Sequence, residues 1–180
     1  AGAFASVADA TGGVESVVNL GLTVVPPQFI TVGLFGIASF MAIATGSSSG
    51  TTAALGTIAY TISIGAGLNT PMVLAAVLGG AFFGDNLSII SDTTIVATTT
   101  QGVEMKDKFK MNLLIALPAA ILAGIVYMVL GSPEQVVNID PSGYNLVLII
   151  PYIYVLVASL LGMNVFIVLG SGTFVAGILG

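Results

Sequence analysis

The 180-residue chain contains no cysteine, histidine, arginine or tryptophan, and its only basic residues are three lysines. Without cysteine it cannot form disulfides or thiolate metal sites. Without histidine it cannot build a serine–histidine triad or an imidazole-bound zinc site. Three basic residues are too few for the positive surface that binds nucleic acid. Cysteine catalysis, serine–histidine catalysis and nucleic-acid binding are thereby excluded. Enzymatic activity and a bound cofactor are likewise not expected.

Charged side chains of either sign are scarce. They make up 6% of the residues, against roughly a quarter in a typical soluble domain. None occurs between Glu15 and Asp85, a run of 69 residues. The composition is 56% hydrophobic and the mean hydropathy is +1.10. A soluble domain has no need of such a long uncharged stretch, so the sequence predicts an integral membrane protein whose main partner is the lipid bilayer.

The fold class predicted is all-α, a polytopic bundle of transmembrane helices in which some helices are broken or re-entrant. A helix needs about 20 apolar residues to cross the hydrocarbon core. Residues 1–180 are expected to form a single transmembrane domain, an incomplete part of a larger transporter whose remaining helices are its partners. The sequence does not decide whether the protein forms homo-oligomers. The approximate crossings expected are 28–44, 53–68, 71–84, 111–130 and 144–161.

The distribution of charge around the fourth predicted crossing indicates its orientation. All three lysines lie in residues 104–110, whereas the segment 132–143 on the other side of the crossing carries only acids. Because cytoplasmic loops are enriched in lysine and arginine, residues 104–110 are predicted to be cytoplasmic and 132–143 external. The lysines are interpreted as a topology signal only. Tyr144, Tyr152 and Tyr154 are predicted interfacial anchors of the last crossing.

Two polar stretches, residues 45–52 and 84–101, interrupt the apolar sequence. Irregular backbone at membrane depth persists only where it is buried in protein or lines a wet cavity. Secondary transporters use such broken helices, with their free carbonyls and helix ends, to hold ions. The two interruptions are therefore the predicted functional site.

The second interruption contains two aspartates, Asp85 and Asp92. Carboxylates at membrane depth are costly and usually mark an ion or proton pathway. Seven residues separate them, so on a continuous helix they would share a face with Ser88 between them. Carboxylate, amide and hydroxyl oxygens suit a hard cation such as Na⁺. The candidate ion-binding and proton-coupling residues are Asp85, Asp92, Ser88, Ser91, Asn86, Thr93 and Thr94, with the two aspartates as Na⁺ ligands and Ser48 and Thr51 as a secondary ion path.

A carboxylate that binds either Na⁺ or H⁺, but not both, produces antiport once it alternates between the two sides of the membrane. A plainer interpretation stays open, in which Asp85 and Asp92 only cap the ends of broken helices. The hydroxyls of residues 45–52 suit local packing as well as ion contact. Asp9 and Glu15 are interpreted as solvated or helix-end acids rather than ligands.

Three stretches of this sequence resemble motifs of the NhaC-type Na⁺/H⁺ antiporters. Residues 84–94 read G-D-N-L-S-I-I-S-D-T-T and are followed by the basic segment up to Lys110. Residues 45–51 are similar to the T-G-[TS]-S-x-G-T motif of that family, with Ser49 in place of a bulkier residue. The opening residues 1–4, with Thr11 and Gly12, resemble its A-G-x-F…T-G segment. The resemblance covers essentially the whole chain.

The resemblance implies a secondary transporter of a bacterial cytoplasmic (inner) membrane that exchanges Na⁺ for H⁺ through the site residues named above. The alternative is a Na⁺- or H⁺-coupled transporter of organic acids, such as malate and lactate, or of amino acids. An anionic substrate would be expected to meet a cation or a helix N-terminus at depth. A passive structural subunit and an intramembrane aspartyl protease are weaker alternatives, the latter because its two aspartates usually lie on separate helices.

Overall fold

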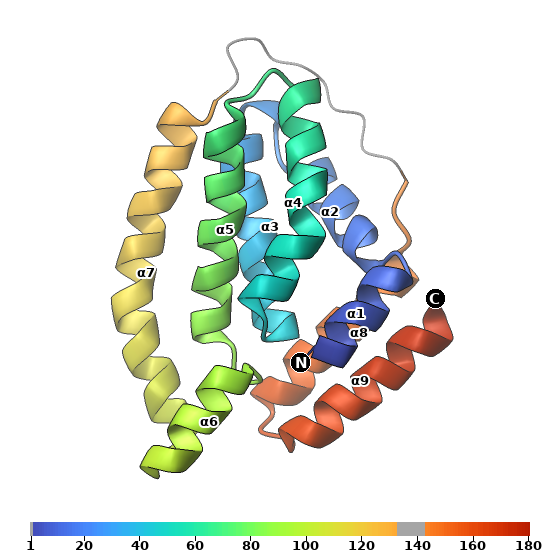
Figure 1. Cartoon of the computed structure of the whole chain (residues 1–180), viewed down its shortest axis with the longest axis vertical. Coiled ribbons are helices and arrows are strands. Elements are labelled where there is room, and N and C mark those ends of the chain that lie inside the picture. The colour runs from blue at the N-terminus through green and yellow to red at the C-terminus, as the bar shows by residue number, and fades with distance from the viewer. Residues whose placement is uncertain (1, 133–142) are drawn as a thin grey trace.

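A computed structural model describes residues 2–132 and 143–180, and within these ranges the chain forms helices and loops without any strand. The all-α fold class predicted from the sequence is confirmed. Figure 1 shows α3, α4, α5 and α7 running along the long axis, with the other helices packed beside and below them. The elements are α1 (Gly2–Ala10), α2 (Gly13–Val24), the short 3₁₀ helix η1 (Pro27–Phe29), α3 (Ile30–Thr45), α4 (Ser48–Gly65), α5 (Thr70–Leu87), α6 (Asp92–Gln101), α7 (Met105–Leu130), α8 (Leu146–Leu160) and α9 (Val165–Leu179).

Among the described residues, three helical stretches are long and apolar enough to span a membrane: Pro27–Thr45, Thr70–Gln101 and Met105–Leu130. The second of these includes the interruption between α5 and α6. Helices α3, α4, α5, α7 and α8 overlap the five crossings expected from the sequence. Together with the composition, these helices make the chain an integral membrane protein, while its division into five crossings of a single domain stays a prediction.

Polar side chains fix the starts of several helices by accepting hydrogen bonds from free backbone N–H groups. The hydroxyl of Ser47 accepts from Gly50 N at 3.0 Å and so caps α4. Asn69 caps α5 by accepting from Met72 N at 3.1 Å, one residue after Pro71 in the first turn. The cap fixes the first turn of α4, and Ser48 of that turn contacts the end of α5.

Helices α3 and α5 form the most extensive helix pair in the described structure. The pair is close because α5 presents glycine to the backbone of α3, which is a common way for membrane helices to approach each other. A Cβ atom added at Gly80 would overlap the carbonyl oxygen of Phe35, and one added at Gly84 would overlap that of Ser39. The contact at Gly84 holds the last turn of α5, and with it Asp85, against α3.

The C-terminal helices α8 and α9 pack against each other; α8 also packs against α2 and α3, and α9 packs against α1. Tyr152 on α8 is 0% exposed, and its ring meets that of Phe4 edge-on, with 5.6 Å between the ring centroids. The sequence prediction that Tyr152 is an interfacial anchor is therefore wrong. Helix α1 covers this part of α8, a contact between the two ends of the chain that the local sequence does not reveal.

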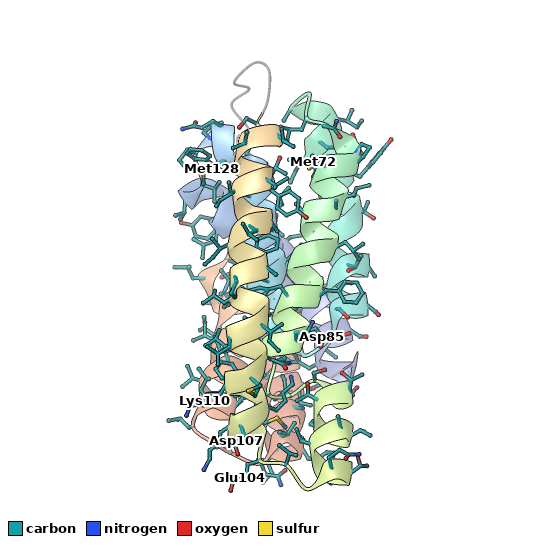
Figure 2. All side chains as sticks on the ribbon, turned by 90° about the vertical axis from the view of Figure 1, so that its left-hand side faces the viewer. Met72, Asp85, Glu104, Asp107, Lys110 and Met128 are labelled. Atoms are coloured by element: carbon teal, nitrogen blue, oxygen red, sulfur yellow. The ribbon has the colours of Figure 1, made fainter. Side chains whose placement is uncertain are left out.

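The charged segment 104–110 lies at one end of the molecule. Figure 2 shows Glu104, Asp107 and Lys110 at the lower end of the bundle, with Asp85 partway along it. Of the segment predicted to lie on the opposite side of the membrane, residues 133–142 fall outside the described residues. The two ends of α7, at Met105 and Leu130, nevertheless lie at opposite ends of the molecule (Figure 1).

Candidate functional site

The carboxylate of Asp85 lies where the end of α5 meets the start of α4. Asp85 is half-buried, and its Oδ2 atom accepts a hydrogen bond of 2.9 Å from the hydroxyl of Ser48, the first residue of α4. The N-terminal end of a helix carries a partial positive charge, which favours a carboxylate at this place. The structure thus brings together two residues that come from the two different polar interruptions.

The chain is not helical between Asp85 and Asp92. Helix α5 ends at Leu87, residues 88–91 form an irregular link, and α6 begins at Asp92. The condition under which both aspartates and Ser88 would share one face, a continuous helix, is therefore not met, and the break falls inside the interruption predicted at residues 84–101. Asp85 is at the end of one helix and Asp92 is at the start of the next, where an acidic side chain suits the helix dipole.

The two interruptions pack against each other. Gly46 ends α3 in the left-handed conformation, with φ of 66°, and a Cβ atom there would come within 2.9 Å of the backbone of Ile90 and Ser91. The Ser88 hydroxyl donates a hydrogen bond of 2.9 Å to the carbonyl oxygen of Ile43 near the end of α3. Irregular backbone from two parts of the sequence is thereby buried in one place, as expected for a site inside a membrane protein.

Lys108 of α7 forms hydrogen bonds to residues on both sides of the α5–α6 break. Its ammonium group donates to the carbonyl oxygen of Asn86 and to the hydroxyl of Thr94, both at 2.7 Å. Asn112, one turn later, donates to the same Asn86 oxygen at 2.8 Å. Helix ends leave carbonyl oxygens without partners, and a lysine is a suitable donor for them. The interpretation of the lysines as a topology signal only missed this contact, because Lys108 meets residues 14 and 22 positions away.

The other predicted residues lie around this centre in different ways. Asp92, Thr93 and the side chain of Asn86 are exposed in this chain. Ser91 is buried, and its hydroxyl hydrogen-bonds to that of Thr93 at 2.9 Å. The hydroxyl of Thr51, in the first turn of α4, pairs with that of Thr45 at the end of α3 at 3.3 Å. The structure thus gives the Thr51 hydroxyl a hydrogen-bond partner on α3 and not the carboxylate of Asp85.

Two buried oxygen atoms near this centre lack a hydrogen-bond partner within the described residues: Asp85 Oδ1 and Thr52 Oγ1. Thr52 is four residues after Ser48, so the two lie on the same face of α4, the face that meets Asp85. A buried polar atom left unsatisfied costs about 1–3 kcal/mol. A bound cation or proton would remove that cost at Asp85. Thr52 is thus an additional candidate ligand for the ion.

We expect the Lys108→Met substitution to destabilise the protein, because it leaves carbonyl and hydroxyl oxygens of the break without their charged donor. Hydrogen bonds to charged groups contribute about 1.5–3 kcal/mol when buried, and Lys108 is only half-buried. The free energy of unfolding should therefore fall by about 1–3 kcal/mol, measured by thermal unfolding of the purified full-length parent protein.

Lys106→Met is the matched control for that substitution. Lys106 pairs with Glu104 at 2.7 Å, but the two side chains are 78% and 67% exposed. An exposed ion pair contributes about 0–1 kcal/mol, so the control should unfold close to the parent. Equal losses of stability in the two variants would contradict the role of Lys108 at the break.

In sequence comparison, the family model described as the Na⁺/H⁺ antiporter family matches residues 1–132 of this chain. That range contains both interruptions, Asp85, Ser48 and Lys108. No solved structure matches the chain significantly.

Three curated relatives are named as antiporters. The chain is 34% identical over 131 residues to the malate-2H⁺/Na⁺-lactate antiporter of Bacillus subtilis, covering 73% of this chain and 28% of that protein. It is 30% identical over 163 residues to an uncharacterized Na⁺/H⁺ antiporter of Haemophilus influenzae, covering 83% and 35%. It is 28% identical over 124 residues to the Na⁺/H⁺ antiporter NhaC of Alkalihalophilus pseudofirmus, covering 69% and 27%. The chain thus spans about a quarter to a third of the length of these relatives.

Proposed function

Because this chain belongs to the Na⁺/H⁺ antiporter family, we propose that the full-length protein exchanges Na⁺ for H⁺ across the membrane and that Asp85 is the carboxylate that binds both ions in turn. The observation that carries the proposal is the half-buried carboxylate itself. One of its oxygens accepts from Ser48, and the other, Oδ1, is buried without a partner among the described residues.

The surroundings of Asp85 suit a small cation. Oxygen atoms are the ligands that hard cations prefer, and Thr52 Oγ1 is a second oxygen on the same face of α4 that lacks a partner in the described chain. When Na⁺ leaves, a proton on the carboxylate neutralises the same buried charge. Ser88, Ser91 and Thr94 shape the backbone around the ion. Asp92, Thr93 and Asn86 are exposed in this chain, so their part depends on helices outside it.

The proposed setting is a bacterial cytoplasmic (inner) membrane, with residues 104–110 on the cytoplasmic side. The positive-inside bias of the three lysines supports this orientation. Asp85 would then lie on the cytoplasmic half of the protein, since Lys108 of the first turn of α7 reaches the end of α5. No cofactor is needed for this exchange, and the remaining helices of the full-length protein would complete the pathway.

One observation favours a second candidate, a transporter of an organic acid. Lys108 places a cation at the α5–α6 break, and anionic substrates are often held by cations or helix N-termini. One relative is named a malate-2H⁺/Na⁺-lactate antiporter. The ammonium group of Lys108, however, already donates to Asn86 and Thr94 at 2.7 Å each. Because these bonds occupy much of its donor capacity, Na⁺/H⁺ exchange remains the proposed function.

The test is ²²Na⁺ uptake driven by an imposed pH gradient in proteoliposomes of the full-length parent protein. The expected result is Na⁺ uptake that needs the pH gradient and no organic acid. Uptake that occurs only when malate or lactate is present on the opposite side would establish the second candidate. Absence of any Na⁺ movement under both conditions would contradict both.

A further inference from the structure

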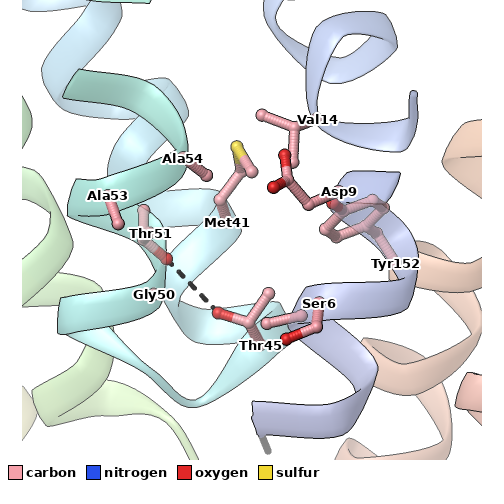
Figure 3. Close-up of a pocket in the computed structure, with 11 residues that line it drawn as sticks. Ser6, Asp9, Val14, Met41, Thr45, Gly50, Thr51, Ala53, Ala54 and Tyr152 are labelled. Carbon is pink, nitrogen blue, oxygen red and sulfur yellow. Dashed lines mark hydrogen bonds between the residues drawn. The ribbon is translucent and has the colours of Figure 1, made fainter. Parts of the chain in front are cut away.

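A cavity of about 250 Å³ lies beside the first turns of α4, and Asp85 is not among its lining residues. It is bounded by α1, the start of α2, the end of α3, the first turns of α4, and α8 (Figure 3). Its oxygen-bearing side chains come from Ser6, Asp9, Thr45, Thr51 and Tyr152. Apolar side chains of Val14 and Met41, together with small alanines and Gly50, form the rest of the wall.

Asp9 supplies the charge in this cavity. Figure 3 shows its carboxylate directed into the space beside Met41 and Val14, next to the ring of Tyr152. The carboxylate is accessible, so an ion can reach it. The sequence interpretation of Asp9 as a solvated or helix-end acid did not foresee these neighbours, because they come from helices distant in the sequence.

Tyr152 provides an independent observation that favours ligand binding in this cavity. Its side chain is 0% exposed, it lines the cavity, and its hydroxyl has no hydrogen-bond partner among the described residues. Buried tyrosine hydroxyls usually find a partner, and leaving one unsatisfied costs about 1–3 kcal/mol. A phenylalanine ring would fill the same space, so packing alone does not explain the hydroxyl. A ligand bound in the cavity would give the hydroxyl a hydrogen-bond or coordination partner.

The backbone beside Asp9 is also broken. Helix α1 ends at Ala10, Gly12 adopts the left-handed conformation with φ of 79°, and α2 begins at Gly13. On the facing side, α3 ends and α4 begins close to Thr45 and Thr51, whose hydroxyls pair at 3.3 Å. Two helix breaks therefore meet at one cavity, which is the arrangement by which membrane transporters form ion sites.

The atoms of the cavity that could coordinate an ion indicate the kind of ligand. They are oxygen atoms with a single carboxylate, and the described residues contain no group of three histidine, cysteine, aspartate or glutamate side chains that could hold a metal ion. Oxygen ligands suit hard cations, and one negative charge matches a monovalent ion. We propose that Asp9, Thr45, Thr51 and Tyr152 form a second alkali-cation site for Na⁺, distinct from the site at Asp85.

The first turn of α4 connects the two sites. Ser48 on this turn hydrogen-bonds to Asp85, and Thr51 on the same turn hydrogen-bonds to Thr45 at the cavity. A shift of this turn would therefore change both sites together. The inference concerns binding at Asp9 alone, and it holds whether or not Asp85 is the exchanging carboxylate.

The test is equilibrium binding of ²²Na⁺ to the purified full-length parent, with the bound Na⁺ counted per chain at saturation. Asp9→Asn should bind one Na⁺ fewer than the parent. Glu15→Gln is the matched control, since Glu15 is an exposed acid on the neighbouring helix α2 and does not line the cavity. The control should bind as many Na⁺ ions as the parent.

Tyr152→Phe keeps the ring packing against Phe4 and removes only the hydroxyl, so it tests the cavity even if Asp9→Asn fails to fold. It should weaken one Na⁺ site by about 3- to 10-fold. Unchanged Na⁺ binding in either folded variant would overturn the proposal. Asp85→Asn distinguishes the site at Asp9 from the site proposed at Asp85. If Asp9→Asn binds one Na⁺ fewer than the parent and Asp85→Asn binds as many as the parent, the result would support the site at Asp9 and contradict the one at Asp85.

Discussion

Replacing Asp85 with asparagine is expected to abolish Na⁺/H⁺ exchange by the full-length protein. Asparagine keeps the size of the side chain and can still accept the bond from Ser48, so the contact between α4 and α5 should survive. What is lost is the negative charge that we propose binds Na⁺ and, in turn, the proton. We expect the rate of pH-driven ²²Na⁺ uptake in proteoliposomes to fall at least about 100-fold, equivalent to about 2.7 kcal/mol.

Asp107→Asn is the matched control, because it makes the same chemical change at an exposed acid in the first turn of α7. It should transport like the parent. Thermal unfolding of both variants separates a lost site from a lost fold. A folded Asp85→Asn variant that exchanges at the parent rate would show that Asp85 only caps the helix end, the plainer interpretation of this residue.

The second large effect is expected at Gly84, the residue before Asp85. Alanine normally favours a helix over glycine by about 1 kcal/mol. At Gly84, however, the added Cβ would overlap the carbonyl oxygen of Ser39, and the side chain of Ala42 is also within 2.8 Å of it. The overlapping atom belongs to the backbone of α3, which cannot change rotamer as a flexible side chain can. To accommodate the added Cβ atom, α3 and α5 must move apart. We expect Gly84→Ala to lower the free energy of unfolding by about 1–3 kcal/mol.

Gly56→Ala on α4 provides the comparison, since a Cβ atom there meets nothing within 4 Å. It should leave stability unchanged or raise it by up to about 1 kcal/mol. Thermal unfolding of the two full-length variants measures the difference. Because α5 carries Asp85, Gly84→Ala should also slow exchange, whereas Gly56→Ala should not. Two variants of equal stability would contradict the close packing of α3 and α5.

Much of this architecture could be predicted from the sequence because membranes impose a strong constraint. The uncharged run before Asp85 specifies apolar helices, and polar stretches within it specify interruptions. The caps at Ser47 and Asn69 follow local rules that operate over three residues. Two of the site candidates, Ser48 and Asp85, come from these interruptions, and the structure places them in contact.

What could not be predicted depends on contacts between distant parts of the chain. The spacing of Asp85 and Asp92 suggested one helical face, but the backbone is irregular at residues 88–91, where it packs against Gly46. The sequence indicated only a topology signal for Lys108, whereas the structure shows its ammonium group bonded to both sides of the α5–α6 break. Asp9 and Tyr152 line one cavity although they are distant in the sequence, and Phe4 of α1 packs against the Tyr152 ring of α8.

The central claim is that Na⁺ and H⁺ compete for the carboxylate of Asp85. The most direct measurement is ²²Na⁺ binding to the purified full-length protein over a series of pH values, for the parent and for Asp85→Asn. The component of binding that Asp85→Asn removes should show an apparent Kd that rises with proton concentration, while its capacity stays constant. Binding that is unaltered by Asp85→Asn, or whose Kd is independent of pH, would contradict the account.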